Sequence, residues 1–202
     1  GDGTSNTELQ VSTAFVVAEK PANPFVDVPA SQYYYEPVLW AVAHVPQITN
    51  GTDATHFSPK DTCTRGQVVT FLWRAAGCPE PSTTVSPFVD VTDPNQYYYK
   101  AVLWAVEKGI TNGKDDTHFD PKATCNRGEV VTFLWRYKNK PGPDGDHNPF
   151  TDVEGGKYYY GPAMWAYYAG VTTGKTADTF VPAATCTRGE IVTFLYRTEK
   201  LS

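Results

Sequence analysis

Three arginines occupy equivalent places in a stretch that the chain repeats three times. Arg65, Arg127 and Arg188 each follow Thr or Asn and precede Gly and then Gln or Glu. The residues that follow each arginine predict a helix, so the arginine falls in its first turn. A cation in the first turn is opposed by the helix dipole, so helix formation does not by itself favour an arginine at this position. A first-turn guanidinium beside free backbone N–H groups could instead bind a carboxylate or a phosphate.

A second interpretation of the same arginines is structural. Each guanidinium could pair with an acidic group of a neighbouring repeat, for which Asp27, Asp90 and Asp152 are the candidates. The residue types and their spacing leave anion binding and structural pairing open.

The residues around the arginines are explained by helix formation. Thr64 with Gln67 forms a capping box, and the other copies repeat the arrangement with Glu in place of Gln. The residue before each cap is a cysteine, at the position of a hydrophobic staple: Cys63, Cys125 and Cys186. We therefore interpret these cysteines as small buried hydrophobes and not as a three-thiolate metal site. We predict neither a metal nor a cofactor.

Other candidate sites are incomplete. His56 and His118 match each other, but the third copy lacks the histidine. Asp115, Asp116 and Asp120 share one loop without the ligand spacing of a calcium-binding EF-hand. No Ser-His-Asp set, phosphate loop or metalloprotease motif is present. We predict no enzymatic activity.

The elements that position the arginines form a unit of ~60 residues. Each unit opens with Phe-x-Asp-Val and a tyrosine triplet, continues into a first helix, and passes through a turn-rich loop that closes with Phe-x-Pro. The loop could form two short strands. The repeated stretch then supplies a second helix, which is apolar on most sides and must be covered on most sides. We predict a mainly α protein in which three units pack as one body, either a closed pseudo-threefold bundle or an open solenoid.

The chain divides into an N-terminal extension and three repeats. We place the extension at 1–22 and the repeats at 23–82, 83–145 and 146–202. Alternation from Leu9 to Val17 predicts one strand, either the tail of an upstream domain or a strand on the first repeat. A partly ordered lead-in is the other interpretation.

Charge and hydropathy exclude two classes of partner. The formal net charge of −5 gives no basic surface, which argues against nucleic acid. No segment approaches the ~20 apolar residues of a membrane span, so we predict no membrane insertion.

The ordered motifs resemble S-layer homology domains. Phe-x-Asp-Val, the aromatic first helix, Gly-Ile-Thr-x-Gly, Phe-x-Pro and Thr-Arg-Gly-Glu/Gln recur in this order over residues 23–197. The resemblance implies a monomeric pseudo-trimer that anchors a larger, secreted bacterial surface protein to the cell wall. Its implied ligand is secondary cell-wall polysaccharide, often carrying pyruvylated N-acetylmannosamine.

The resemblance also implies roles for particular residues. Arg65, Arg127 and Arg188 would contact the acidic ketal, while Asp27, Asp90 and Asp152 would help line the groove. This chain has glycine where the family motif usually has alanine, at Gly66, Gly128 and Gly189. We expect that glycine to leave room for a ligand to approach the backbone. The alternative function is a protein–protein assembly module of a bacterial surface layer, in which the arginines are structural.

Overall fold

The computed structural model describes residues 21–201, so the strand predicted near the N-terminus lies outside the described residues. Each repeat contributes a short helix and a longer one. The short helices are α1 (Tyr35–Ala43), α3 (Tyr99–Glu107) and α5 (Tyr160–Tyr168), and the long helices are α2 (Arg65–Ala75), α4 (Arg127–Tyr137) and α6 (Arg188–Glu199). None of these helices is long and apolar enough to cross a membrane.

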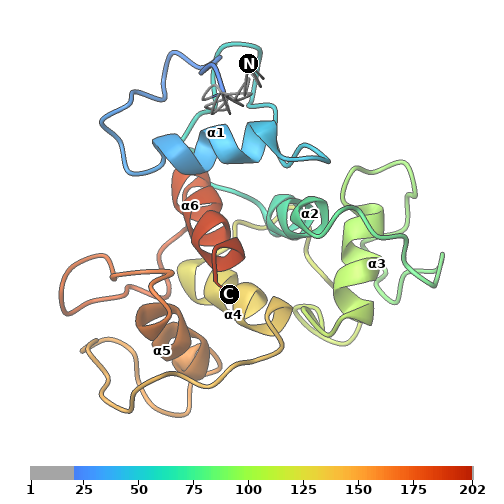
Figure 1. Cartoon of the computed structure of the whole chain (residues 1–202). Helices are drawn as coiled ribbons and strands as arrows, with labels where there is room; N and C mark the ends of the chain where they lie inside the picture. The colour runs from blue at the N-terminus through green and yellow to red at the C-terminus, as the bar shows by residue number, and fades with distance from the viewer. Residues whose placement is uncertain (1–20, 202) are drawn as a thin grey trace, which may run out of the picture.

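The three long helices form the centre of the molecule. Helices α2, α4 and α6 contact one another in all three pairs, and each carries the short helix of another repeat (Figure 1). Helix α3 packs on α2, α5 packs on α4, and α1 packs on α6. The last contact joins the first repeat to the third. The bundle is therefore closed with pseudo-threefold symmetry, and the open solenoid is excluded.

The long helices begin where the residues predict. All three long helices carry a reciprocal capping box, in which the cap side chain and the third helical residue each accept a backbone N–H. Helices α3 and α5 are followed by Gly109 and Gly170, with φ of 67° and 74°, the left-handed conformation typical of a helix end. Local chemistry thus sets the helix boundaries.

The β structure of the described residues is confined to the threefold axis, so the prediction of short strands in the loops was wrong. Three isolated bridges join the repeats there, pairing Thr62 with Thr187, Thr64 with Thr124, and Asn126 with Thr185. Between them the backbone N–H of Cys125 donates to Cys63 O at 2.9 Å, and that of Cys186 donates to Cys125 O at 3.0 Å. The N–H of Cys63 completes the cycle with Cys186 O at 3.4 Å.

The cysteines at this axis are free and fully buried. Burial raises the pKa of Cys63 to about 11 and raises the pKa of Cys125 and Cys186 well above the ordinary thiol value, so the thiols stay neutral. Within residues 21–201 no three His, Cys, Asp or Glu side chains are grouped so as to hold a metal ion. The cysteines fill the axis as small apolar side chains.

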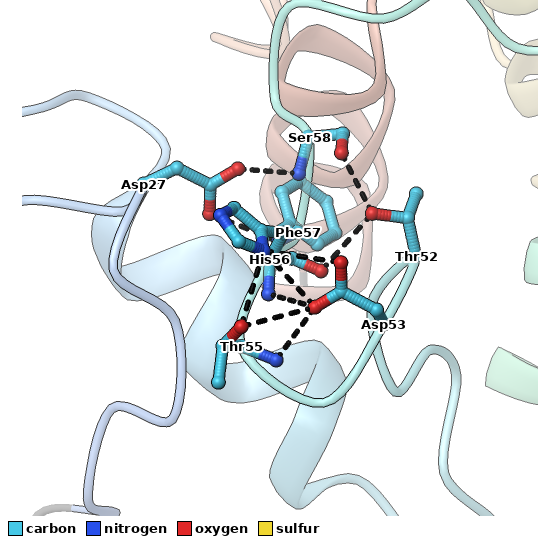
Figure 2. A network of polar contacts seen from close by, with 7 residues as sticks. All are labelled: Asp27, Thr52, Asp53, Thr55, His56, Phe57 and Ser58. Carbon is cyan, nitrogen blue, oxygen red and sulfur yellow. Dashed lines mark hydrogen bonds and ion pairs between the residues drawn. The ribbon is translucent and has the colours of Figure 1, made fainter.

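The loops before α2 and α4 are turns held by a carboxylate, while in the loop before α6 the hydroxyl of Thr176 accepts the corresponding backbone N–H. In the first repeat, Asp53 Oδ1 accepts from the backbone N–H groups of Thr55 and His56, both at 2.8 Å (Figure 2). These hydrogen bonds, that of Thr55 first, lower the pKa of Asp53 to about 2. The second repeat repeats the geometry around Asp115. In these loops, side-chain oxygens accept backbone N–H groups that would pair with a neighbouring strand in a β-ladder.

A substitution in this loop tests how tightly it is built. Gly113 has φ of 90°, and a Cβ there would lie 2.5 Å from Asp115 O and 2.6 Å from Phe88 Cε1. We expect Gly113→Ala to lower the free energy of unfolding by about 2 kcal/mol or more, measured by urea denaturation. Gly161→Ala, in α5 with nothing near its Cβ, is the control and should be neutral or stabilising. Equal effects of the two variants would contradict this description of the loop.

Candidate functional site

Each first-turn arginine reaches across a repeat boundary. Arg65 Nε donates to Phe119 O at 2.8 Å, and its Nη1 donates to Glu129 Oε1 at 2.9 Å. Arg127 makes the same bonds to Phe180 O and Glu190 Oε1, at 2.7 and 2.9 Å. Structural pairing with the next repeat is therefore present, but its acid is the capping-box glutamate and not the aspartate that the residues suggested.

The guanidinium groups are buried between aromatic rings. Arg65 Cζ lies 4.8 Å from the ring centroid of Phe119 and 5.4 Å from that of Phe133. Arg127 and Arg188 are held in the same way by the phenylalanines of the repeat that they enter. The three arginine residues are only 2%, 1% and 5% exposed, in chain order. Each cation is thus fixed in position by a carbonyl oxygen and two rings.

The backbone at the start of the long helices is already occupied. Arg65 N donates to Ala123 O and Gly66 N to Pro121 O, both at 2.9 Å, and the other two helices repeat the pair. The free N–H groups expected for an anion are therefore taken by the next repeat. A Cβ on Gly66 would lie 3.0 Å from Pro121 O and 3.1 Å from Tyr98 Cδ1. The glycine admits the neighbouring repeat, which corrects our expectation that it admits a ligand.

The three aspartates stand behind the arginines. Asp90 accepts from Phe119 N at 3.0 Å and from Asp120 N at 2.7 Å, and the carbonyl of Phe119 receives Arg65 Nε. Asp27 and Asp152 hold the two other Phe-x-Pro segments in the same way, as Figure 2 shows for Asp27. None of the three is among the residues that line the two grooves described next. Each aspartate therefore does not contact the arginine but holds the phenylalanine whose carbonyl oxygen accepts from the arginine Nε.

A groove of about 450 Å³ opens beside Arg65. Helix α4 and the loop before it form its floor, so we call it the repeat-2 groove; Arg65 enters from repeat 1 and Tyr158 from repeat 3. The residues that line it are Arg65, Thr111, Gly113, Lys114, Asn126, Glu129, Thr132, Phe133, Arg136 and Tyr158. Every repeat contributes to this one groove.

The repeat-1 groove has the same plan in a smaller volume of about 140 Å³. Arg188 enters it from repeat 3 and Tyr97 from repeat 2, while α2 and its loop form the floor. Thr49, Asn50, Gly51, Gln67, Thr70, Phe71 and Arg74 complete the lining. Arg65 and Arg188 thus each line a groove to which all three repeats contribute.

The structure adds cationic residues that we did not single out. Arg136 lies in the last turn of α4, lines the repeat-2 groove and donates from Nη1 to Ile110 O at 3.1 Å. Arg74 and Arg197 are bound in the same way to Ile48 O and Val171 O. Lys114 lines the groove as well and donates to Glu129 Oε1 at 2.7 Å. The recurrence of an arginine at the end of each repeated stretch was the signal that could have identified the second set.

The glutamates balance these cations. Burial alone would raise the pKa of Glu129, but the hydrogen bonds from Lys114 and from Asn126 N, together with the charge of Arg65, outweigh burial and lower it. Glu190 is lowered for the corresponding reasons, with Lys175 as its lysine partner. Both glutamates are therefore ionised at neutral pH.

The lowered pKa of these glutamates makes stability depend on pH. A carboxyl whose pKa is lower in the folded state stabilises above its unfolded pKa, and this stabilisation is lost as pH falls below about 4.5. We expect Glu129→Gln/Glu190→Gln to lower the free energy of unfolding at pH 7 by roughly 1–3 kcal/mol and to flatten its fall in acid. Glu80→Gln/Glu154→Gln removes two exposed glutamates and is the control. Parallel pH profiles for wild type and the first variant would contradict the pairing.

The aspartate support can be tested separately. Asp90→Asn retains one acceptor oxygen and sets an NH2 group against a backbone N–H, so we expect a loss of about 1–3 kcal/mol in the free energy of unfolding. The Nε–Hε resonance of Arg65 should also shift, because Phe119 O moves with its segment. Asp116→Asn, which changes an exposed aspartate in the loop before Phe119, is the control. An unchanged Arg65 resonance would show that Asp90 does not position the arginine.

Comparison with known proteins identifies the repeats. A family model described as "S-layer homology domain" matches residues 24–69, 87–131 and 149–192. An endoglucanase of Bacillus sp. (strain KSM-635) is 27% identical over 192 residues, which are 92% of this chain and 19% of that protein. An S-layer protein of Bacillus thuringiensis subsp. finitimus is 26% identical over 179 residues, 87% of this chain and 21% of that protein.

The chain spans about one fifth of the length of each of these relatives. One relative is named as an enzyme and the other as a surface-layer protein. Each is similar to this chain over most of its three-repeat length. This pattern supports a cell-surface anchoring module and indicates a location at the cell surface or cell wall. With the three repeats closed into one bundle and matched one by one, the chain belongs to the S-layer homology domain family.

Proposed function

We propose that this module holds a larger secreted protein on the bacterial cell wall by binding an anionic secondary cell-wall polysaccharide. The ligand group is the carboxylate of a pyruvyl ketal on N-acetylmannosamine, and the sites are the grooves between repeats. The observation that carries the proposal is the pair of arginines in each described groove, Arg65 with Arg136 and Arg188 with Arg74. Arg127 with Arg197 provides the third pair, and the module acts as a monomer.

The groove chemistry suits a charged sugar. A guanidinium fixed by a carbonyl and two rings loses little freedom when it binds a carboxylate, which favours charge-assisted hydrogen bonds. Tyr158 stands at the rim with an exposed fraction of 56% and offers a ring face to a sugar. The volume of the repeat-2 groove falls within the ~300–1,000 Å³ typical of small-molecule sites.

The aspartates enter this proposal as positioning residues. Asp27, Asp90 and Asp152 each hold the segment whose carbonyl receives an arginine, so they place the cation without contacting the glycan. The remainder of the longer protein is what the module would anchor. We assign the module no catalytic step.

The proposal is tested by binding to purified cell walls. We expect labelled protein to sediment with walls that carry pyruvyl ketals and to lose at least about tenfold in affinity after mild acid removes the ketals. The triple variant Arg74→Gln/Arg136→Gln/Arg197→Gln should weaken binding to intact walls by a similar factor. Lys122→Gln, on an exposed surface away from the grooves, is the control.

Two outcomes would contradict it. Undiminished binding to stripped walls would exclude the ketal as the ligand group. Absence of wall binding together with concentration-dependent self-association, measured by sedimentation velocity, would favour the assembly module instead. Thermal unfolding of each variant separates loss of binding from loss of fold.

A further inference from the structure

The three sites differ by a coupled replacement at two positions. Repeats 2 and 3 carry a lysine just after the loop glycine and a glutamate in the capping box, and the two side chains contact each other. Repeat 1 has Thr52 and Gln67 at these positions. The replacement removes one positive and one negative charge, so the formal charge around the site stays the same.

The glutamate determines what the buried arginine can bind. Glu129 Oε1 lies 2.9 Å from Arg65 Nη1 and 2.7 Å from Lys114 Nζ, and its lowered pKa keeps it charged. A ligand carboxylate at this arginine would have to displace the glutamate or lie beside its negative charge. The Arg127–Glu190–Lys175 site presents the same obstacle.

Arg188 has no such counter-ion. Its Nε donates to Phe57 O at 2.8 Å, its Nη2 is buried without a hydrogen-bond partner, and no carboxylate within residues 21–201 pairs with it. Arg127 Nη2 is likewise unpartnered, so the distinguishing feature of Arg188 is the missing carboxylate at Nη1. The thiol of Cys63 beside it is kept neutral by burial and supplies no charge.

Gln67 presents a hydrogen-bond donor where the glutamate of repeats 2 and 3 presents an acceptor to the buried arginine. Its Oε1 accepts the capping bond from Thr64 N at 2.9 Å, so the amide NH2 takes the place of the carboxylate oxygen that meets Arg65 in repeat 2. Two donors, the guanidinium of Arg188 and the amide of Gln67, therefore line one groove with Arg74. Only a ligand with acceptor oxygens can satisfy both.

We propose that the repeat-1 groove is the selective carboxylate receptor of this protein and that the capping-box glutamates weaken carboxylate binding at the other two sites. Thr52 and Gln67 are then the residues that determine specificity. The volume of about 140 Å³ suits a compact group such as a ketal carboxylate rather than a longer stretch of polysaccharide. This inference rests on the proposed function and names which site carries it.

Exchange of the paired residues provides the test. The probe is the 4,6-pyruvyl ketal of methyl N-acetylmannosaminide, titrated by calorimetry into the whole chain. Thr52→Lys/Gln67→Glu gives repeat 1 the residues of repeat 2, and Lys114→Thr/Glu129→Gln makes the reverse change. Both exchanges keep a capping box, and Gln67→Glu alone introduces the carboxylate without altering Thr52 and its hydrogen bonds.

We expect one tight site in wild type, weakened at least about tenfold by Thr52→Lys/Gln67→Glu and by Gln67→Glu alone. Lys114→Thr/Glu129→Gln should raise the number of tight sites from one to two. At low probe concentration the Nε–Hε resonance of Arg188 should shift before those of Arg65 and Arg127.

Three equal sites in wild type, or unchanged affinity in both repeat-1 variants, would overturn this inference and leave the proposed function standing. Absence of probe binding to wild type at any concentration tested would overturn both. Unfolding curves for each variant confirm that the compared proteins are folded.

Discussion

The structure depends on a cation buried at every boundary between repeats. An arginine in the first turn of each long helix leaves water, works against its own helix dipole, and enters the neighbouring repeat. The cost is offset there by a carbonyl oxygen and two aromatic rings, and in two of the three cases by a glutamate. Because the carbonyl belongs to a segment held by an aspartate, each arginine can be placed only when the next repeat is folded. The third arginine requires the first repeat, which closes the ring.

The grooves form only when the three repeats pack together, because the arginines that join the repeats also line the grooves. The same contacts that join two repeats also define the wall of a groove. A tyrosine from the remaining repeat completes the lining: Tyr158 of repeat 3 in the repeat-2 groove and Tyr97 of repeat 2 in the repeat-1 groove. A unit of ~60 residues is marginal alone, so the arrangement that stabilises the three units is also the one that assembles the sites. It follows that no single repeat contains a complete groove. A change in one repeat can alter the groove of the repeat before or after it.

The sequence was sufficient for features set by local chemistry. Capping boxes and buried cysteines depend on residues a few positions apart, and the structure confirms them. Closure of the ring and the partner of each arginine depend on residues 53 to 131 positions apart, for which spacing gives no guide. Gly66 was misinterpreted for the same reason, because the tyrosine that packs on it comes from the next repeat. The prediction of strands in the loops was wrong because a carboxylate in repeats 1 and 2, and a hydroxyl in repeat 3, accepts N–H groups that a second strand would otherwise pair.

Repeat 1 differs from the other two repeats at two positions that are otherwise alike. Thr52 and Gln67 lie in different segments, yet both differ from their counterparts and together leave the formal charge unchanged. A replacement that served only helix capping would not require the lysine to change, since Gln67 caps as Glu129 does. The lysine and glutamate contact each other in the other repeats, so the loss of the glutamate leaves the lysine without its carboxylate partner. The two positions therefore change together, and their replacement leaves the buried guanidinium of Arg188 without a carboxylate partner among residues 21–201.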